Sequence, residues 1–254
     1  MEMRSQPPRI FALAGIIEPI VPLGGSVVFG ALRPGYDASH AISELGQQGS
    51  AYAVVWNVVG FGGSALLYAL FAVAVGAALG RGWLFRLIAF QAVLIAASGT
   101  FSCDPGCPPM MSSWQGWSHT VAGLAYFAAT CVVPLVAWRT FRRSTGWRSL
   151  APVSLVAGVI LIGLFFVGPI LFGPDLVGFW QRITLAIAGA WAATVALRLW
   201  RLSSAIAQGR QRSDPVQART PADLPRTPRR WAALNVHDLL AAAQSVSCLH
   251  DGVA

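Results

Sequence analysis

The residues most suited to chemistry lie in short segments between long apolar runs. One segment, 33–46, carries an imidazole, a hydroxyl and a carboxylate, on His40, Ser43 and Glu44. The capping residues Asp37 and Ser39 and the glycine at Gly46 are typical of helix ends, so we expect a short helix that stops at Leu45. Residues three and four apart share a helix face, which would place the three side chains together. The alternative is a capped interfacial helix with a solvated polar side.

A second segment holds two cysteines, Cys103 and Cys107, separated by an Asp104-Pro105-Gly106 turn. Such a turn could close a small disulfide ring on an oxidising side of a membrane. A thiol redox pair is the second interpretation and a metal site the third. The spacing is CxxxC, and zinc needs four ligands or three with water. We therefore expect a disulfide and no metal, and an inert buried thiol at Cys131.

These segments connect runs that are long enough to cross a membrane. Only 11% of the residues are charged, whereas soluble domains carry about 25%. A bilayer core needs about 20 apolar residues per helix. The chain offers six such runs, and we predict an all-α bundle of transmembrane helices over Ile10–Leu32, Ala51–Leu79, Trp83–Phe101, Trp117–Trp138, Leu150–Phe172 and Gly178–Trp200.

The arginines predict the orientation of this bundle, because cytoplasmic loops are enriched in positive charge. All 18 basic residues are arginines. They cluster before the first run, between the second and third, between the fourth and fifth, and after the sixth. The opposite loops hold only Arg33, with Arg182 just inside the last run. We predict that both termini are cytoplasmic and that the protein is a multi-pass protein of the cell inner or plasma membrane.

The composition changes after the sixth run. We predict a transmembrane domain over residues 1–202 and a cytoplasmic tail over 203–254. Residues 208–230 are rich in Arg, Pro, Asp and Thr and should be disordered. Residues 231–249 could form an amphipathic helix, although an unstructured tail is favoured. The arginines are not interleaved with aromatic residues on one face, so nucleic-acid binding is not expected. Membrane lipids are the expected partners, with a second copy or another membrane protein as further possibilities.

Several polar residues fall inside the runs. Glu18 lies beside Pro19 in the first run, which should be kinked there. A carboxyl group in the membrane is a candidate functional residue, and a hydrogen-bonded structural group is the equal alternative. Asn57, His119 and Arg182 lie at similar depth near the outer ends of the second, fourth and sixth runs.

Short motifs around these runs resemble one family. They are Tyr36-Asp37, Ile42-Ser-Glu-Leu-Gly46, Phe101-Ser-Cys-Asp-Pro105, Ser118-His119 with Gly123, and Gln181-Arg182. Their order is similar to that of an uncharacterised bacterial membrane family, domain-of-unknown-function family 998. The resemblance covers about Ile10 to Trp200. It implies a six-helix membrane protein and supplies no activity.

The pattern is also faintly similar to a superfamily of membrane hydrolases that includes alkaline ceramidases. That resemblance implies a catalytic set of Ser43, Asp104 and His119. Only His119 lies in a run and only His40 is a further histidine outside the tail, so three histidines are not available for zinc. A hydrolase would then be metal-free, with His119 as base and Asp104 orienting it.

We therefore weigh two functions. The slightly favoured one is a protein that binds a lipid or small ligand at the outer face or assists a partner, with no cofactor. Its polar network would comprise His40, Glu44, Asn57 and Arg182. The alternative is a hydrolase of a lipid or lipid-linked substrate. In either case we expect Arg182 to pair with Asp104 or Glu44 in a cavity shared with His119, because an unpaired guanidinium in the membrane is costly.

Overall fold

The computed structural model describes residues 10–107 and 112–213, and every regular element in this part of the chain is helical. Contacts divide the chain into two units, residues 1–209 and 210–254, and the first unit is described below. The expectations for Trp231–Leu249, and for His237, Cys248 and His250 near it, concern residues outside the described ranges.

Five helical segments are long and apolar enough to cross a membrane: Ala53–Leu79, Trp83–Thr100, Trp114–Arg143, Thr145–Phe172 and Pro174–Ser204. A sixth span is the pair α1 (Ile10–Ile17) and α2 (Ile20–Ala31), which meet at an angle of 46°. The break falls at Glu18 and Pro19, because proline cannot donate the backbone hydrogen bond that would continue α1. The predicted all-α architecture is confirmed, with five membrane-spanning helices in the described residues, or six when the bent α1–α2 pair is counted as one span. The protein is an integral, multi-pass membrane protein.

The second span is composite. It contains α3 (Ala53–Trp56), the π-helical turn η2 (Asn57–Gly62) and α4 (Gly63–Leu79). The other spans are α5 (Trp83–Thr100), α6 (Trp114–Arg143), α7 (Ala151–Phe172) after the 3-10 turn η3 (Thr145–Leu150), and α8 (Val177–Ser213) after the 3-10 turn η4 (Pro174–Leu176). A π turn widens a helix locally and often marks a functional site.

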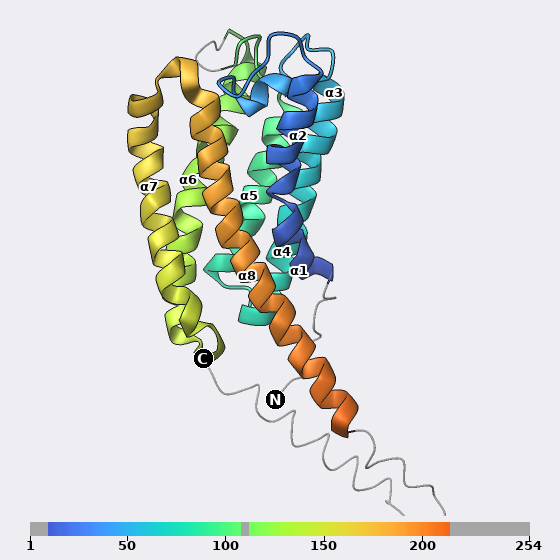
Figure 1. Ribbon diagram of the computed structural model, residues 1–254, viewed down its shortest axis with the longest axis vertical. Coiled ribbons are helices and arrows are strands. Elements are labelled where there is room, and N and C mark those ends of the chain that lie inside the picture. Colours follow the sequence, from blue (N-terminus) through green and yellow to red (C-terminus); the bar gives the residue numbers. More distant parts are fainter. Residues whose placement is uncertain (1–9, 108–111, 214–254) are drawn as a thin grey trace, which may run out of the picture. The chain divides into compact units, whose positions relative to one another are not determined.

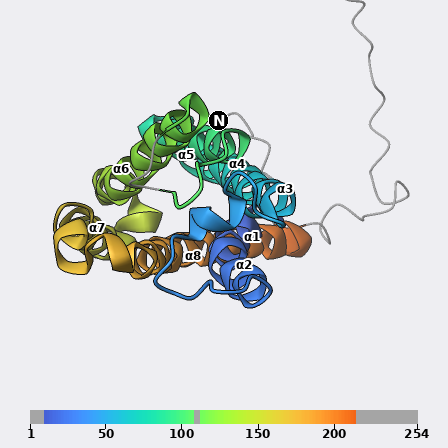
Figure 2. The same cartoon turned by 90° about the horizontal axis from the view of Figure 1, so that it is seen from above.

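The spans form two facing rows. Figure 2 shows α4, α5 and α6 along one side, and α7, α8 and the α1–α2 pair along the other. Neighbours in sequence pack on one another, α4 on α5, α5 on α6 and α6 on α7, while α1 packs on α4. The core between the rows includes Phe71, Val75, Ile88 and Phe141.

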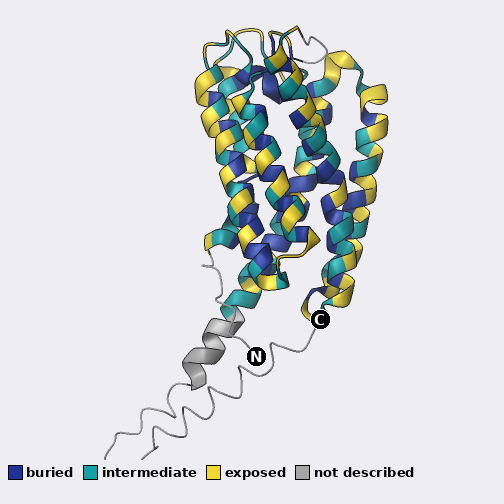
Figure 3. Ribbon diagram, turned by 180° about the vertical axis from the view of Figure 1, so that it is seen from behind, coloured by how far each residue is buried: buried dark blue, intermediate teal, exposed yellow. Residues whose placement is uncertain are grey.

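The outward faces carry large apolar side chains, as expected where lipid replaces water as the solvent. Val58, Val121, Phe166 and Ile170 are among the exposed ones. Exposed and buried residues alternate along each helix, with the buried ones turned inward (Figure 3).

The segments 32–52, 101–107 and 173–176 lie at one end of the bundle, which we call the loop end (Figure 1). Segment 32–52 crosses between the two helical rows there (Figure 2). Its predicted helix is shorter and tighter than expected, because only the 3-10 turn η1 (Ile42–Gly46) forms. His40 precedes this turn, so His40, Ser43 and Glu44 do not share a helix face.

Candidate functional site

The bundle encloses a cavity of about 260 Å³ below the loop end, which we call the bundle cavity. Five membrane-spanning segments and η1 contribute to its wall, which is mostly apolar. The lining residues that enter the discussion below are Glu18, Ser43, Ser64, His119, Gly123, Leu124, Tyr126 and Gln181. Leu124 is 56% exposed, so the wall of the cavity extends to the lipid-facing surface of α6.

The irregular parts of two spans shape this cavity. The π turn η2 contributes Gly60 and Phe61 to the wall. A Cβ on Gly60 would lie 2.8 Å from the Trp56 ring, so glycine is required for the indole to pack there. The break between α1 and α2 places Glu18 and Pro22 on the wall of the cavity as well. A regular helix in either place would present different side chains.

Glu18 is 5% exposed and lines the cavity. The side chains of Ser64 and Tyr68 lie beside its carboxyl group. The Tyr68 hydroxyl is 3.1 Å from the Tyr126 hydroxyl. The Ser64 hydroxyl faces Glu18 without completing a hydrogen bond of normal geometry, and it has no other partner in the described residues. A polar group on a bound molecule could satisfy it.

His119 is 5% exposed and also lines the cavity. Its Nδ1 lies 2.7 Å from the Ser98 carbonyl oxygen and 2.9 Å from the Phe101 carbonyl oxygen. Carbonyl oxygens only accept, so Nδ1 carries the proton and Nε2 keeps its lone pair. The Phe61 ring packs edge-on against the imidazole at 5.7 Å. The ring is therefore held in one orientation, with an acceptor nitrogen free for a ligand.

Ser43 lies in η1 and reaches the same cavity. No hydrogen bond joins its hydroxyl to His119 in the part of the chain that the structure describes. Glu44 is buried beside it and accepts a hydrogen bond from the Ala41 N–H at 3.0 Å, while its carbonyl accepts one from Arg33. The Glu44 carboxylate thus caps the start of its own turn, η1, and does not line the cavity.

Asp104 holds the residues that lead into α6. Its carboxylate accepts hydrogen bonds from the Ser112 and Ser113 N–H groups, at 2.7 and 2.9 Å, and from the Ser113 hydroxyl. Gln48 donates to it from segment 32–52 at 3.2 Å. The Ser113 hydroxyl and N–H, followed by Ser112, hold the pKa of Asp104 below its ordinary value. No hydrogen bond or ion pair joins Asp104 to His119 in the part of the chain that the structure describes.

Arg182 binds the backbone of segment 32–52. Its Nη1 donates to the carbonyl oxygens of Ala38 and His40, both at 2.9 Å, and its Nη2 donates to the Tyr36 hydroxyl at 2.9 Å. The predicted pairing with Asp104 or Glu44 is wrong, because these carbonyls already satisfy the guanidinium. Of the four residues expected in one cavity, only His119 lines it.

Neighbouring Gln181 contributes to the same attachment. Its Oε1 accepts a hydrogen bond from the Ile42 N–H at 2.8 Å, and the residue also lines the cavity. The Gln181-Arg182 pair therefore fastens η1 above the cavity.

The two remaining network residues also fix the loop end. His40 Nδ1 lies 3.3 Å from the Asp37 carboxylate, the one ion-pair geometry found among the described residues. Hydrogen bonds from Ser39 lower the pKa of Asp37 to about 2. Asn57 donates to the Gly46 carbonyl at 3.1 Å and to the Ser102 hydroxyl at 2.7 Å. Asn57 thereby joins segment 32–52 to segment 101–107.

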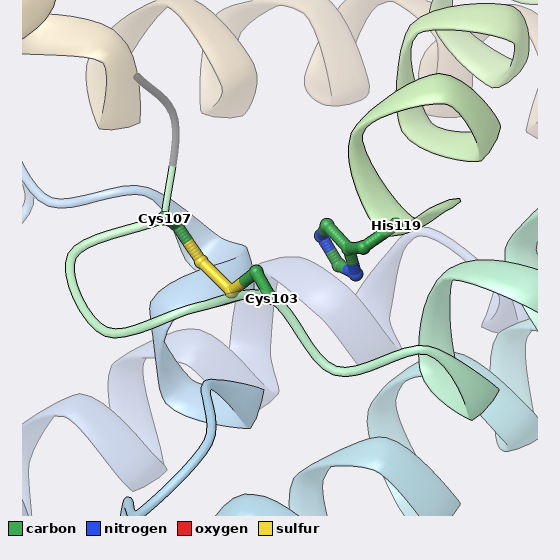
Figure 4. Close-up of side chains that lie close together, drawn as sticks. All are labelled: Cys103, Cys107 and His119. Carbon is green, nitrogen blue, oxygen red and sulfur yellow. A yellow bond between two sulfur atoms is a disulfide. The ribbon is translucent and has the colours of Figure 1, made fainter. Parts of the chain in front are cut away.

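The predicted disulfide between Cys103 and Cys107 is present. Both cysteines are buried, and Cys103 Sγ lies 3.5 Å from the Ser43 carbonyl oxygen. Figure 4 shows the His119 ring beside this disulfide. Cys131 is a free, buried cysteine in α6, in agreement with the sequence.

Sequence reasoning missed Ser64, Tyr68 and Tyr126 around Glu18. A signal existed, since Ser64 and Tyr68 are four residues apart and therefore share a helix face. Polar groups on one face of an otherwise apolar span point to a bundle interior. Nothing in the sequence showed that this face meets Glu18.

Comparison with known families gives one match. Residues 16–198 match DUF998, described as a protein of unknown function. No curated protein and no solved structure matches the chain. The match spans most of the chain and includes the bundle cavity, so this protein belongs to the DUF998 family.

Proposed function

We propose that the protein binds a lipid-like molecule with a small polar group in the bundle cavity. One observation supports this most directly: buried polar groups with unused hydrogen-bonding capacity face a mostly apolar cavity. These groups include the Ser64 hydroxyl, the Trp56 indole N–H and His119 Nε2, and Glu18 lies beside Ser64. Ligand sites typically combine an apolar wall with a few placed polar groups.

The dimensions define the ligand further. A cavity of about 260 Å³ lies just below the range of small-molecule sites, roughly 300–1,000 Å³. A small amphiphile or part of one acyl chain fits, whereas a whole phospholipid does not. Exposure of Leu124 at the surface of α6 gives such a molecule a route from the bilayer.

The polar residues of the cavity wall indicate which head group the ligand carries. Glu18 offers acceptor oxygens, and His119 Nε2 is an acceptor because Nδ1 carries the proton. Ser43 and Ser64 can donate or accept. Trp56, whose indole N–H has no partner in the described residues, also lines the cavity. A ligand bearing a hydroxyl, which both donates and accepts, therefore matches this wall best.

A hydrolase is the second candidate, because Ser43 and His119 line one cavity. A nucleophile must lie within hydrogen-bond reach of its base, and that contact is not formed. Asp104 is also committed to the α6 terminus. Covalent labelling of Ser43 by a fluorophosphonate would support the hydrolase over the binding protein.

Gly123 allows a direct test, because it lines the cavity and a Cβ there would meet open space. Gly123→Leu should fill the cavity without disturbing the backbone. Gly163→Leu, in α7, is the matched control, since its Cβ also meets nothing within 4 Å and the residue lies outside the cavity wall. The probe is a diazirine-bearing long-chain alcohol, added to the detergent-solubilised protein.

Wild type and Gly163→Leu should crosslink to the alcohol at cavity residues, identified by peptide mass spectrometry. Gly123→Leu should lose this crosslink, and the matching diazirine alkane without a hydroxyl should label the wild type more weakly. Equal labelling of all three proteins at the cavity would contradict the proposal. If the cavity is not labelled and the protein instead co-purifies with another membrane protein in detergent, a role in assisting a partner would be favoured.

A further inference from the structure

Three buried ligand atoms converge beside the bundle cavity. The sulfurs of Cys103 and Cys107 and a ring nitrogen of His119 all lie within 4.8 Å of one another. Segment 101–107 supplies the sulfurs and α6 supplies the imidazole (Figure 4). The three residues are at most 5% exposed, so no bulk water separates them.

The surroundings of His119 are those of a metal ligand. A metal-binding histidine usually donates its second ring N–H to a carbonyl or carboxylate, which fixes the ring and its tautomer. His119 Nδ1 makes this contact with the carbonyl oxygens of Ser98 and Phe101. Nε2 then presents its lone pair and has no hydrogen-bond partner in the described residues. This is an observation independent of the cysteine pair.

The disulfide alone does not account for the arrangement. Its cysteines are four residues apart, and a ring this small removes less entropy from the unfolded chain than a longer one would. The neighbouring carboxylate of Asp104 is already occupied by Ser112, Ser113 and Gln48. It therefore does not compete for the sulfurs or the imidazole.

We propose that reduction of the Cys103–Cys107 disulfide creates a zinc site formed by Cys103, Cys107 and His119. A dithiol reductant supplies two electrons and two protons to the S–S bond and becomes a disulfide itself. Zinc then displaces the two thiol protons and accepts the His119 lone pair. Thiolate and imidazole are the ligands that zinc prefers, and three protein ligands leave a fourth position for water.

This site would adjoin the bundle cavity, because His119 lines it. The inference does not depend on lipid binding. Gly123→Leu should abolish ligand labelling and leave metal binding intact, so failure of one proposal is distinguishable from failure of the other.

The test uses the full-length protein in detergent. The protein is reduced with a phosphine, desalted without oxygen and titrated with Co²⁺ as a spectroscopic probe for the zinc site. We expect thiolate-to-cobalt charge-transfer bands that saturate at one ion per chain and disappear when zinc is added. Cys131→Ser, which removes the remaining described cysteine, is the control and should keep these bands.

The double variant Cys103→Ser/Cys107→Ser should lose the bands. His119→Gln should weaken cobalt binding at least about tenfold, the smallest loss expected even for a residue that only supports a metal ligand. Absence of bands in the reduced wild type, or bands unaffected by His119→Gln, would overturn the proposal.

A second readout covers the case in which His119→Gln does not fold. Zinc should slow alkylation of Cys103 and Cys107 in the reduced wild type, followed by peptide mass spectrometry. Unchanged alkylation rates with and without zinc would overturn the proposal without any variant.

Discussion

The charged side chain of Asp104 fixes the backbone just before α6 by accepting its N–H groups. Its carboxylate receives two N–H groups at the start of α6 and an amide from segment 32–52. Ser113 is the N-cap of α6, and a negative charge beside the N-terminus of a helix is stabilising. A Cβ on Gly116 would overlap this carboxylate, which shows how closely the two segments approach.

This arrangement makes stability depend on pH. The pKa of Asp104 is lower in the folded protein than its ordinary value of 3.8, chiefly because of hydrogen bonds from Ser113. The contribution is therefore complete well above pH 3.8 and is lost as the pH falls through the lowered pKa. We predict that Asp104→Asn lowers the thermal unfolding midpoint in detergent at pH 7 by a few degrees, and that this difference shrinks below pH 3.8.

Asp175→Asn is the control, because Asp175 is exposed in η4. Its unfolding midpoint should follow that of the wild type throughout the pH range. A constant difference between Asp104→Asn and the wild type at all pH values would contradict the assignment of the lowered pKa to Asp104.

Arg182 shows why a partner is hard to predict from residue types alone. The sequence displays carboxylates, and Asp104 and Glu44 were the plausible acceptors by depth. The structure instead supplies backbone carbonyl oxygens from Ala38 and His40, which every sequence contains. Their position depends on how segment 32–52 folds back, and no local pattern encodes that.

At the scale of elements, the contact between segment 32–52 and α8 determines the roof of the cavity. The Gly178 N–H donates to the Ser39 carbonyl at 2.8 Å, one turn before Gln181 and Arg182 make their own bonds. A Cβ on Gly178 would lie 2.0 Å from the His40 carbonyl oxygen. Backbone atoms cannot move aside as a flexible side chain can, so this close approach requires glycine.

We predict that Gly178→Ala displaces segment 32–52 and destabilises the bundle by roughly 1–3 kcal/mol, the usual cost of overpacking. The measurement is the thermal midpoint in detergent, combined with hydrogen exchange of residues 36–46. Exchange should accelerate in this segment and remain unchanged in α5.

Gly163→Ala is the matched control, since its added Cβ meets open space. It should leave both the midpoint and the exchange pattern unchanged. Exchange in segment 36–46 that is equally slow in Gly178→Ala and wild type would show that the segment does not depend on this contact.

The sequence predicts the spans well and the connecting segments poorly, and the cause is physical. Every residue of a span must meet the same apolar requirement, so the signal repeats over about 20 positions. The start of α5 at Trp83 and the end of α4 at Leu79 match the prediction. In segment 32–52 the conformation of each residue depends on a different tertiary contact, which no repeating pattern reveals. The sequence therefore placed His40 on a helix that begins only at Ile42.

In the candidate site too, features that are local in sequence were predicted and features that depend on tertiary contacts were not. The disulfide was predicted from two cysteines close in sequence, and His119 from its position near the outer end of the fourth run. The bundle cavity could not be foreseen, since it requires the π turn at Asn57–Gly62, the break at Glu18 and the approach of α6 to α8 at once. Each feature is local, but the cavity exists only where they meet.

At the scale of the whole molecule, the bundle separates its polar groups by position. Large apolar side chains such as Val93 and Phe166 face outward, and the tyrosine pair Tyr68 and Tyr126 is buried inside. Arginines at the end opposite the loop end rest on tryptophan rings, with Arg86 over Trp83 and Arg142 over Trp138. Tryptophan and arginine together are typical of the boundary between lipid and water.

The hydrogen bonds of the arginines bear on the predicted orientation of the bundle. Both arginines near the loop end are engaged internally, Arg33 with the Glu44 carbonyl and Arg182 with segment 32–52. The positive charges that remain available to the surface therefore concentrate at the opposite end, in the α4–α5 and α6–α7 connections. Positive charge in short loops is retained in the cytoplasm, so the loop end should face away from it.

We predict that reporter domains fused after Gly35, Gly106 and Gly173 lie outside the cytoplasm, and that those fused after Gly82, Gly146 and Gln208 lie inside. Paired reporters, one active only outside and one only inside, measure each site twice. Replacing Arg142 and Arg143 with glutamine should weaken the preference, because these arginines form the last turn of α6, beside the loop whose retention they are expected to determine. Arg33→Gln should not weaken it, because Arg33 is bound within the fold. If every fusion reports the opposite side, the bundle is inserted the other way, the disulfide faces a reducing compartment, and the zinc-binding thiol form becomes the resting state. A reversal at one internal connection alone would instead break the count of six spans, because the two spans that flank this connection would then fail to cross.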